Sequence, residues 1–398
     1  MVMSENFDTA FEKWFSECTF SCERDRALAE RAYRTLMGNV YTEGTYLWSP
    51  YRCVSPGKKN FRGIWNWDSA FHAMTVSRYD ERLAKSCIDS FVKYILPNGM
   101  LPDVIWLKGD KADNFGKPPV MPWAVLKVYE RTRDMDFLRR NYDLMTKNAA
   151  FWEAERMDGG LFFYSAQENP LADDSLHPRY ESGWDNSPRW DNGIVDLWAI
   201  DLNCFMVLSY RSMAKMAFYL GEDASPWQMR EMELSKLIEE KLFDEKQQAY
   251  VDRNRKTGVF SEVLSPASFM PLFVGIASQA RGEAMNRLAR DPKKFYPGMP
   301  TVSYDHPTFC NDYWRGQTWM NVAYFAIKGL LDYGYKQTAL EIKEFLLDLV
   351  LEELPRGLFE NYDTVKRHGR FHFAFSWSAA FVIELILMRD GEKGLNEL

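Results

Sequence analysis

The chain of 398 residues is poor in cysteine, and six residues of this type are too few to staple a fold of this length with disulfides. Cys18 and Cys22 lie four residues apart, but no second nearby pair completes a zinc site. An excess of basic charge is also absent, since 49 Lys and Arg against 56 Asp and Glu give a net charge of −7. We therefore expect no nucleic-acid partner.

Long apolar segments are missing as well. No uncharged stretch of the sequence approaches the length that spans a bilayer, so we expect no membrane partner. Residues 1–17 show no basic region followed by an apolar one, and they predict no signal peptide. No linker rich in Pro, Gly and Ser divides the chain. These absences together predict a cytoplasmic protein whose residues 1–398 form a single domain.

Aromatic side chains, by contrast, are abundant. Phe, Trp and Tyr make up 15% of the residues, and the chain contains 14 Trp. The apolar fraction of 46% and the charged fraction of 26% are those of a globular protein, so most of these rings are expected in the core. A second interpretation is a site that stacks on flat apolar faces while its polar edges form hydrogen bonds. A sugar ring requires both kinds of contact.

Apolar residues recur at helical spacing along most of the chain, and strand-like segments are short and isolated. The pattern predicts about twelve helices, over residues 23–37, 68–79, 81–96, 122–133, 136–157, 191–220, 226–243, 268–277, 282–289, 317–331, 335–354 and 375–389. Helix pairs are followed by a glycine turn and a short extended piece, at 98–101, 159–162 and 356–359. Hairpins repeated in this way favour a closed ring of hairpins or a solenoid, and six hairpins over this length fit an all-α (α/α)6 barrel, a closed toroid.

Five long connections join these helices, over residues 38–66, 97–121, 158–191, 290–317 and 355–375. All of them are rich in Trp, Tyr, Asp, Glu, Asn and Arg. In a ring of hairpins the loops at one end line a central funnel, and long loops in a compact domain commonly carry function. We therefore expect the functional residues in these connections and at the starts of the helices that follow them.

The segment Tyr180–Asp191 (YESGWDNSPRWD) holds three carboxylates, two indoles and a guanidinium, together with Gly and Pro that favour a turn. A structural interpretation exists for both aspartates. Asp191 is placed to cap the next helix, and Asp185 is placed to close an Asx turn with Ser187. Asp185 also follows Trp184 directly. A carboxyl group held against indoles is desolvated, which raises its pKa and keeps it protonated as an acid.

Three further residues stand out by their surroundings. Glu360 follows a short extended piece in RGLFENYD, and it is either an ordinary surface residue or a side chain that points out of one end of the barrel. Asp68 opens a helix beside Trp67, where it either complements the helix dipole or binds sugar hydroxyls. Arg315 lies between indoles in DYWRGQTW and is suited to binding a carboxylate or a pair of hydroxyls.

Together these segments resemble the catalytic domain of glycoside hydrolase family 63, to which the family 37 trehalases are related. Three motifs carry the resemblance: ESGWDNS with Arg189, YWRG at 313–316 and FENY at 359–362. Looser matches are WDS at 67–69, the Pro-Pro pair at 118–119 with WA at 123–124, and FSWS at 375–378. The motifs follow the family order from about residue 40 to the end of the sequence.

The resemblance implies an (α/α)6 barrel and inverting hydrolysis of an α-linked glucoside or mannoside, either a disaccharide or a small substrate like a glycosylglycerate. It implies that Asp185 is the general acid and Glu360 the general base. It also implies a set of substrate-binding residues: Trp67, Asp68, Trp123, Trp184, Arg189, Trp314, Arg315, Gln317 and Trp377. This chemistry requires no metal or organic cofactor; the expected partner is a small carbohydrate, and a homo-oligomer is compatible with it.

Three departures from the family pattern concern the identity of the substrate. Lys117 stands before the Pro-Pro pair where the family usually has Gln, and Gln317 follows Trp-Arg-Gly where Pro is frequent. The third departure follows the expected base motif, where the family normally has a turn that contains Asn-Pro; here Asp363 leads into residues 364–372, which include the basic loop 366–372 (KRHGRFH). Compact bacterial members of the family act on glucosylglycerate and mannosylglycerate. The loop is therefore either a solvated run of charges or a clamp for an anionic, glycerate-like aglycone.

Two other functions fit parts of the sequence. A sugar epimerase on the same barrel would transfer protons with a pair of histidines, for which His368 and His372 are the candidates. A sugar-binding protein without activity would keep the tryptophans and lose one carboxylate, whereas both Asp185 and Glu360 are present.

Overall fold

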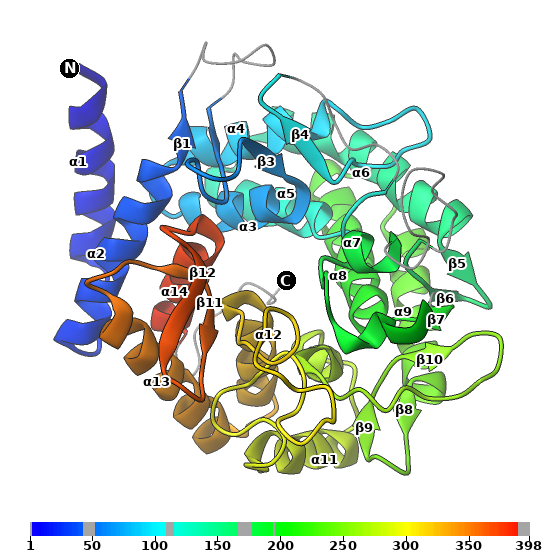
Figure 1. Ribbon diagram of the computed structural model, residues 1–398. Coiled ribbons are helices and arrows are strands. Elements are labelled where there is room, and N and C mark those ends of the chain that lie inside the picture. Colours follow the sequence, from blue (N-terminus) through cyan, green and yellow to red (C-terminus); the bar gives the residue numbers. More distant parts are fainter. Residues whose placement is uncertain (1, 43–51, 109–114, 166–176, 194–195, 389–398) are drawn as a thin grey trace.

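The computed structural model describes residues 2–42, 52–108, 115–165, 177–193 and 196–388. Within these ranges the chain is mainly helical (Figure 1). The helices are α1 (Val2–Glu17), α2 (Glu23–Gly38), α3 (Asn66–Val76), α4 (Glu81–Val92), α5 (Met121–Thr132), α6 (Met135–Glu155), α7 (His177–Ser182), α8 (Ile200–Leu220), α9 (Ser225–Lys241), α10 (Met270–Phe273), α11 (Gln279–Arg290), α12 (Met320–Asp332), α13 (Lys336–Glu353) and α14 (Ser376–Leu387), with the 3₁₀ segments η2 (Pro188–Gly193) and η3 (Pro266–Phe269). None of the helices in these ranges is both long and apolar enough to cross a membrane.

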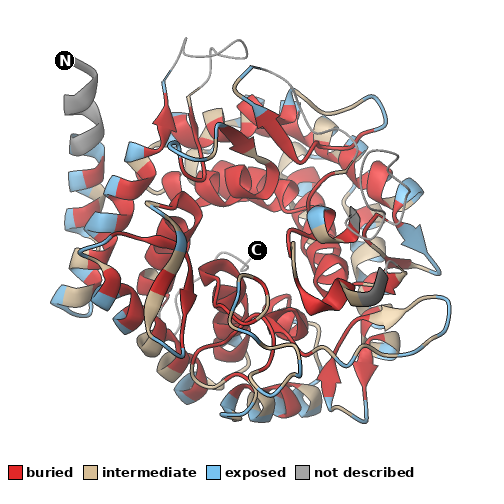
Figure 2. Cartoon of the chain, viewed as in Figure 1, coloured by how far each residue is buried: buried red, intermediate tan, exposed pale blue. Residues whose placement is uncertain are grey.

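Six helices form a closed inner ring. Each contacts the next in the order α14, α3, α5, α8, α10 and α12, and α12 contacts α14 again. A second layer surrounds this ring, in which α2, α4, α6, α9 and α13 each pack on an inner helix and α11 contacts α13. The inner ring is almost entirely buried in Figure 2, whereas the outer helices expose one side. The architecture is the (α/α)6 barrel that the sequence predicts.

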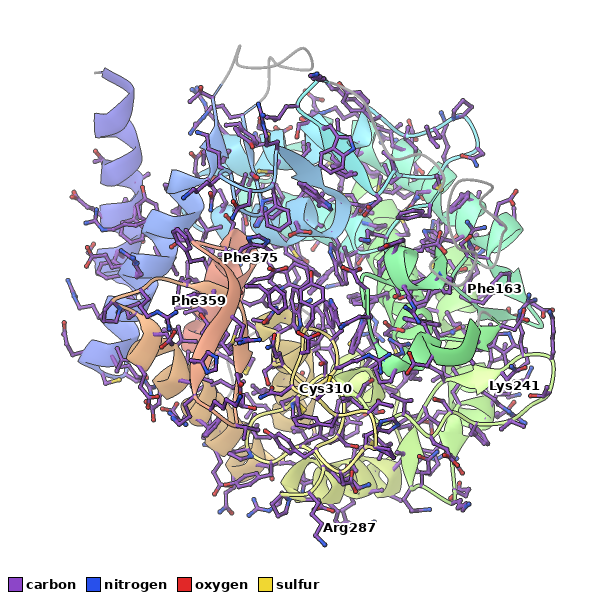
Figure 3. All side chains as sticks on the ribbon, in the orientation of Figure 1. Phe163, Lys241, Arg287, Cys310, Phe359 and Phe375 are labelled. Carbon is purple, nitrogen blue, oxygen red and sulfur yellow. The ribbon has the colours of Figure 1, made fainter. Side chains whose placement is uncertain are left out.

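The two layers differ in the way that their sequences are patterned. Every residue of α3 is buried, as is every residue of α14 before Leu387, because an inner helix has neighbours on all its faces. The outer helix α4 instead buries one stripe, which includes Leu83, Cys87 and Phe91 at a spacing of four residues. Side chains fill the space inside the ring, with Phe375 beside them (Figure 3).

Short antiparallel pairs of strands connect the helices. Within the described ranges the pairs are β1 (Val40–Tyr41) with β2 (Cys53–Val54), β3 (Gly63–Trp65) with β4 (Val104–Trp106), β5 (Met157–Asp158) with β6 (Leu161–Phe162), β7 (Leu197–Trp198) with β10 (Arg253–Asn254), β8 (Phe243–Asp244) with β9 (Ala249–Tyr250), and β11 (Phe359–Asp363) with β12 (His368–Phe373). The hairpin β11–β12 contacts α13 and α14 and is the longest of these pairs.

The helix predicted over residues 191–220 starts too early. The α-helix begins only at Ile200, because residues 197–198 form β7 and satisfy their backbone groups by pairing with β10. Asp191 therefore does not cap this helix. It lies in η2, and its carboxylate forms an ion pair with Arg315.

The helix predicted over residues 268–277 is also shorter than expected. It consists of η3 and the four-residue α10, and the chain turns at Gly275, whose φ is +72°. The N-terminal helix α1 was not predicted; the ring of its Phe11 stacks on Tyr33 of α2 with 3.5 Å between the ring centroids. The other predicted helices all correspond to helices of the structure, with ends that differ by a few residues.

Candidate active site

A cavity of about 190 Å³ opens at one end of the barrel. Most of its walls come from the segments that lead into inner helices, as the sequence predicts for a funnel formed by long connections. Its lining consists of Pro56, Phe61, Trp65, Trp67, Asp68, Asp103, Lys117, Tyr180, Gly183, Asp185, Tyr313, Trp314, Trp319, Glu360, Phe375 and Trp377. Six of the eleven residues expected at the site are in this set: Trp67, Asp68, Asp185, Trp314, Glu360 and Trp377.

Asp185 lies in the turn that follows α7. Gly183 precedes it with φ of +76°, and its Cα packs so closely on Trp67 that a Cβ there would lie 2.3 Å from the indole. The turn closes through a hydrogen bond from the Ser187 N–H to the Trp184 carbonyl at 3.0 Å. Burial is the main cause that raises the pKa of the Asp185 carboxyl group, to about 6, and the positive charge of Lys117 opposes it.

Glu360 lies in β11, and its side chain is buried. Its Oε1 accepts a hydrogen bond from the Tyr313 hydroxyl at 3.0 Å, and its Oε2 accepts one from the His372 N–H at 3.5 Å. Both donors stabilise the ionised carboxylate, but burial outweighs them and raises the pKa of Glu360 to about 7.

Both carboxyl groups thus have a raised pKa, as the sequence-based interpretation expects for Asp185. Burial acts on both groups, and Lys117 lowers the pKa of Asp185. The two carboxyl groups interact, so their titrations belong to the pair and not to either residue alone.

Tyr313 joins these two carboxyl groups. Its hydroxyl donates to Glu360 at 3.0 Å, and it also lowers the pKa of the Asp185 carboxyl group. Its ring packs edge-on against Trp319 with 5.1 Å between centroids, and its backbone has the left-handed φ of +51°. This conformation is uncommon for a bulky residue and marks a tight local turn of the chain.

A second group of charges lies beside the pair. Lys117 Nζ is 2.9 Å from Asp103 Oδ1, and both side chains are nearly buried. Lys117 also donates to the backbone carbonyl of Tyr180. Burial raises the pKa of Asp68 to about 8, against the positive charge of Lys117 that lowers it. One ammonium group thus faces three aspartates on the cavity wall.

Indoles form the apolar part of the wall. Trp314 and Trp319 stack with 4.1 Å between centroids and 12° between planes, and Trp377 lies 5.3 Å from Trp319. Trp67 meets Trp377 edge-on at 4.9 Å. These contacts fix the rings in place, so their positions are set before a ligand enters.

The other five expected residues do not line the cavity. Trp184 and Trp123 are buried, the former against Trp314 at 4.8 Å and the latter among phenylalanines of the barrel core. Arg315 pairs with Asp191, and Gln317 donates to the backbone carbonyl of residue 311 at 3.0 Å.

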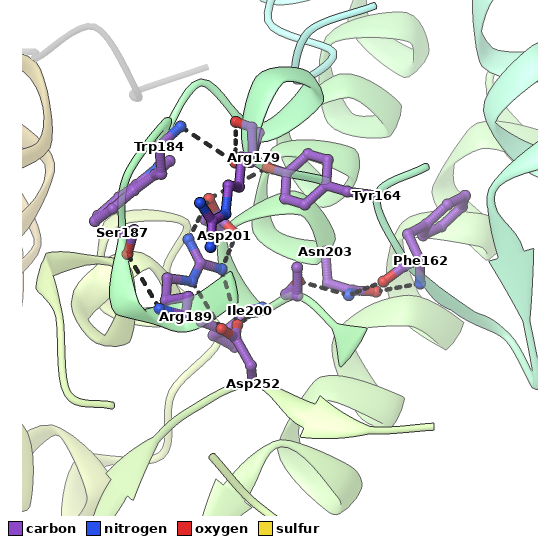
Figure 4. A network of polar contacts seen from close by, with 12 residues as sticks. Phe162, Tyr164, Arg179, Trp184, Ser187, Arg189, Ile200, Asp201, Asn203 and Asp252 are labelled. Atoms are coloured by element: carbon purple, nitrogen blue, oxygen red, sulfur yellow. Dashed lines mark hydrogen bonds and ion pairs between the residues drawn. The ribbon is translucent and has the colours of Figure 1, made fainter. Parts of the chain in front are cut away.

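Arg189, the fifth, is a structural cation and not a cavity residue. Its guanidinium is 1% exposed and lies between two carboxylates, 2.6 Å from Asp201 and 2.7 Å from Asp252 (Figure 4). It also lies 5.0 Å from the ring centroids of both Trp184 and Trp190. It therefore ties the segment that carries Asp185 to α8 and to the strand region at residue 252.

The basic loop 366–372 is mainly a surface feature. Arg367 forms an ion pair with Glu352 of the outer helix α13 at 2.6 Å. Within the described ranges no histidine lines the cavity; His368 lies in β12 opposite Asp363, and the His372 ring faces Asn60 at 2.8 Å. The structure therefore gives no support to proton transfer by a pair of histidines in this cavity.

Several cavity residues were not assigned a role from the sequence, namely Tyr313, Trp319, Asp103 and Lys117. Tyr313 and Trp319 lie in the DYWRGQTW segment, so this motif could have identified both as cavity residues. Asp103 has only its place in a long connection to mark it, since its partner Lys117 is 14 residues away in sequence and meets it through the fold. No group of three or more His, Cys, Asp or Glu side chains in the described ranges is arranged to hold a metal ion.

An (α/α)6 barrel that gathers carboxyl groups and indoles in one cavity fits a glycoside hydrolase, and the match to a family of such enzymes shows that the chain is an enzyme of this class. Residues 62–378 match the family described as mannosylglycerate hydrolase MGH1-like glycoside hydrolase domain. The chain belongs to this family, and the resemblance to family 63 is thereby confirmed.

Similar proteins include two kinds of hydrolase. Mannosylglycerate hydrolase of Rubrobacter radiotolerans is 24% identical over 421 residues, covering 83% of this chain and 92% of the relative. Periplasmic trehalase of Escherichia coli O1:K1 / APEC is 27% identical over 386 residues, covering 81% of this chain and 66% of the relative. The crystal structure of a GH63 mannosylglycerate hydrolase from Thermus thermophilus with Tris and D-glycerate has a TM-score of 0.77 at 22% identity; the match covers 91% of this chain and 100% of that chain.

Proposed function

We propose that the protein hydrolyses an α-linked glycosylglycerate, a glucoside or mannoside of glycerate, with inversion of the anomeric carbon. Asp185 acts as the general acid and Glu360 as the general base. The observation that carries this proposal is that both carboxyl groups line one indole-lined cavity, where the Tyr313 hydroxyl donates to Glu360 and lowers the pKa of Asp185. The glycerate part rests on the relatives, which are named mannosylglycerate hydrolases.

In the proposed reaction the Asp185 carboxyl group gives its proton to the glycosidic oxygen as the bond to the anomeric carbon breaks. A water molecule attacks that carbon from the opposite face of the ring, and Glu360 takes its proton. Inverting enzymes hold the two carboxyl groups about 6.5–9.5 Å apart so that the water fits between substrate and base. We expect a separation in this range when substrate is bound.

The productive state has Asp185 protonated and Glu360 ionised, so a proton held by this coupled pair must lie on Asp185. A sugar ring in the cavity excludes water from Asp185, which raises the pKa of that carboxyl group further. The Tyr313 hydroxyl and the His372 N–H meanwhile remain on Glu360 and stabilise its negative charge. Substrate binding thus shifts the proton toward Asp185.

The cavity also suits the glycone. Stacked indoles offer flat faces to the C–H side of a sugar ring, and Asp68 and the Asp103–Lys117 pair offer acceptors and a donor to its hydroxyls. A volume of about 190 Å³ holds one sugar ring and little more, so the aglycone is expected at the cavity mouth.

The roles of the two carboxyl groups can be separated with two variants and two substrates. We expect Asp185→Asn and Glu360→Gln each to reduce kcat on mannosylglycerate or glucosylglycerate by about 10²–10⁴-fold. On the corresponding α-glycosyl fluoride, whose leaving group needs no proton, D185N should recover most of the loss and E360Q should not. Equal losses for both variants on the fluoride would contradict the assignment of Asp185 as the acid.

A further inference from the structure

The strand that faces Glu360 contains an irregularity at the catalytic end of the barrel. In the hairpin β11–β12, Phe359 pairs with Phe373 and Asn361 pairs with Arg370. Between these pairs β11 has one residue, Glu360, whereas β12 has two, Phe371 and His372. This arrangement is a β-bulge, a feature that often re-aims a side chain next to an active site.

The bulge places Phe371 in a conformation that a bulky side chain rarely adopts. Its φ is +59°, in the left-handed region that favours glycine. The residue is also 48% exposed, so burial of an apolar side chain in the core does not explain a phenylalanine here. A strained backbone combined with an exposed aromatic ring is more typical of a functional position than of a structural one.

The ring of Phe371 lies on a cavity residue. Its centroid is 4.7 Å from that of Tyr313, which lines the cavity and donates to Glu360. The next residue, His372, reaches Glu360 through its N–H and packs its ring against Phe61, another cavity residue, at 4.9 Å. Phe371 therefore lies beside the mouth of the cavity, on the wall that holds the base.

We propose that Phe371 is a specificity-determining residue, whose ring extends the aromatic wall from Tyr313 outward and contacts the C–H face of the aglycone. The inference rests on the proposed function, since it assumes that the glycone fills the cavity and leaves the aglycone at its mouth. The group expected there is the short carbon chain of the glycerate aglycone, because an exposed phenyl ring offers apolar contact to C–H groups and no hydrogen bond.

The neighbouring Phe373 provides a matched control. It is on the same strand, is 51% exposed, and has a φ outside the left-handed region. Its ring contact is with Lys59, whose Nζ lies 5.6 Å from the centroid, and it does not line the cavity. Loss of Phe373 thus removes an equally exposed ring from the same strand and leaves the contact with Tyr313 in place.

The test compares Phe371→Gly, Phe371→Tyr and Phe373→Ala in the full chain. We expect F371G to raise KM for the intact glycoside at least fivefold, while the inhibition constant of the free monosaccharide product changes less than twofold. F371Y keeps an aromatic face and should behave like the wild type, as should F373A. The Tm of F371G should not fall below that of F373A, because glycine adopts the left-handed φ without strain.

Two outcomes overturn the inference. An unchanged KM in F371G would show that the ring does not touch the aglycone, and equal losses in F371G and F373A would show a general effect on the strand. Failure of the proposed function is a separate result: the wild type itself would then hydrolyse none of the glycosylglycerates or disaccharides offered, whatever stands at position 371.

Discussion

At the scale of single residues, the Tyr313 hydroxyl lowers the pKa of both Asp185 and Glu360. It donates to Glu360 at 3.0 Å and lowers the pKa of that carboxyl group against the effect of burial. Its loss leaves the negative charge of Glu360 with the weaker donor, the His372 N–H at 3.5 Å. The pKa of Glu360 in a variant without this hydroxyl should therefore rise above the wild-type value of about 7.

This gives a prediction for the pH dependence of Tyr313→Phe. The proposed base Glu360 must be ionised, so we expect activity to be lost as the pH falls through its pKa, and a higher pKa moves that limb to higher pH. We expect kcat/KM of Y313F to fall more at pH 6 than at pH 8, with a loss on the acidic limb of about tenfold for every pH unit that the limb moves. The measurement is a pH profile of kcat/KM from pH 5 to 9.

A second tyrosine serves as the control for this experiment. The Tyr304 hydroxyl pairs with Thr364 Oγ1 at 2.9 Å and does not line the cavity. Tyr304→Phe should keep the wild-type profile. A Y313F profile of unchanged shape, lowered equally at every pH, would mean that the hydroxyl serves packing or binding and not the ionisation of Glu360.

At the scale of elements, the buried cluster around Arg189 holds the segment that carries Asp185 against the barrel. Asp201 at the start of α8 and Asp252 both bond the guanidinium, and Asp252 also accepts from the Ile200 N–H at 2.9 Å. One arginine thus compensates two carboxylates away from water. Its removal leaves both of them buried without a cation, which is far more costly than the loss of a surface pair.

We therefore expect Arg189→Met to lower the free energy of unfolding by about 3–5 kcal/mol. The control is Arg287→Met on α11, where an exposed arginine faces Glu283 at 4.0 Å and points to solvent in Figure 3; its loss should cost about 0.5 kcal/mol or less. Urea unfolding of the two variants measures the difference. Equal midpoints would contradict a structural role for Arg189.

The helices and strands also differ in how well they can be predicted from the sequence. Helices with strong periodicity, such as α6 and α13, could be predicted because one face of each is buried against an inner helix. The start of α8 could not, since β7 depends on a partner strand more than fifty residues away. The bulge at Phe371 is hidden for the same reason: it exists only as a mismatch between two strands.

At the scale of the whole molecule, closure of the ring of inner helices brings the cavity residues together. The first and last helices of the barrel, α2 and α14, pack on each other, and α14 also contacts α3. Asp68, Asp185 and Glu360 come from three distant parts of the chain and meet because their segments precede or border inner helices at one end. Sequence motifs could predict that these three residues belong to one site. Only the folded structure shows that Arg189 and Arg315 do not line the cavity.

The central claim is that Asp185 and Glu360 act from opposite faces of one sugar ring. The most direct test follows the anomeric proton of the sugar released from an α-mannosyl- or α-glucosylglycerate by NMR during the first minutes, before mutarotation. The account predicts that the β-anomer appears first and that the α-anomer grows in slowly. Initial release of the α-anomer would mean retention and would contradict the assigned roles of the two carboxyl groups.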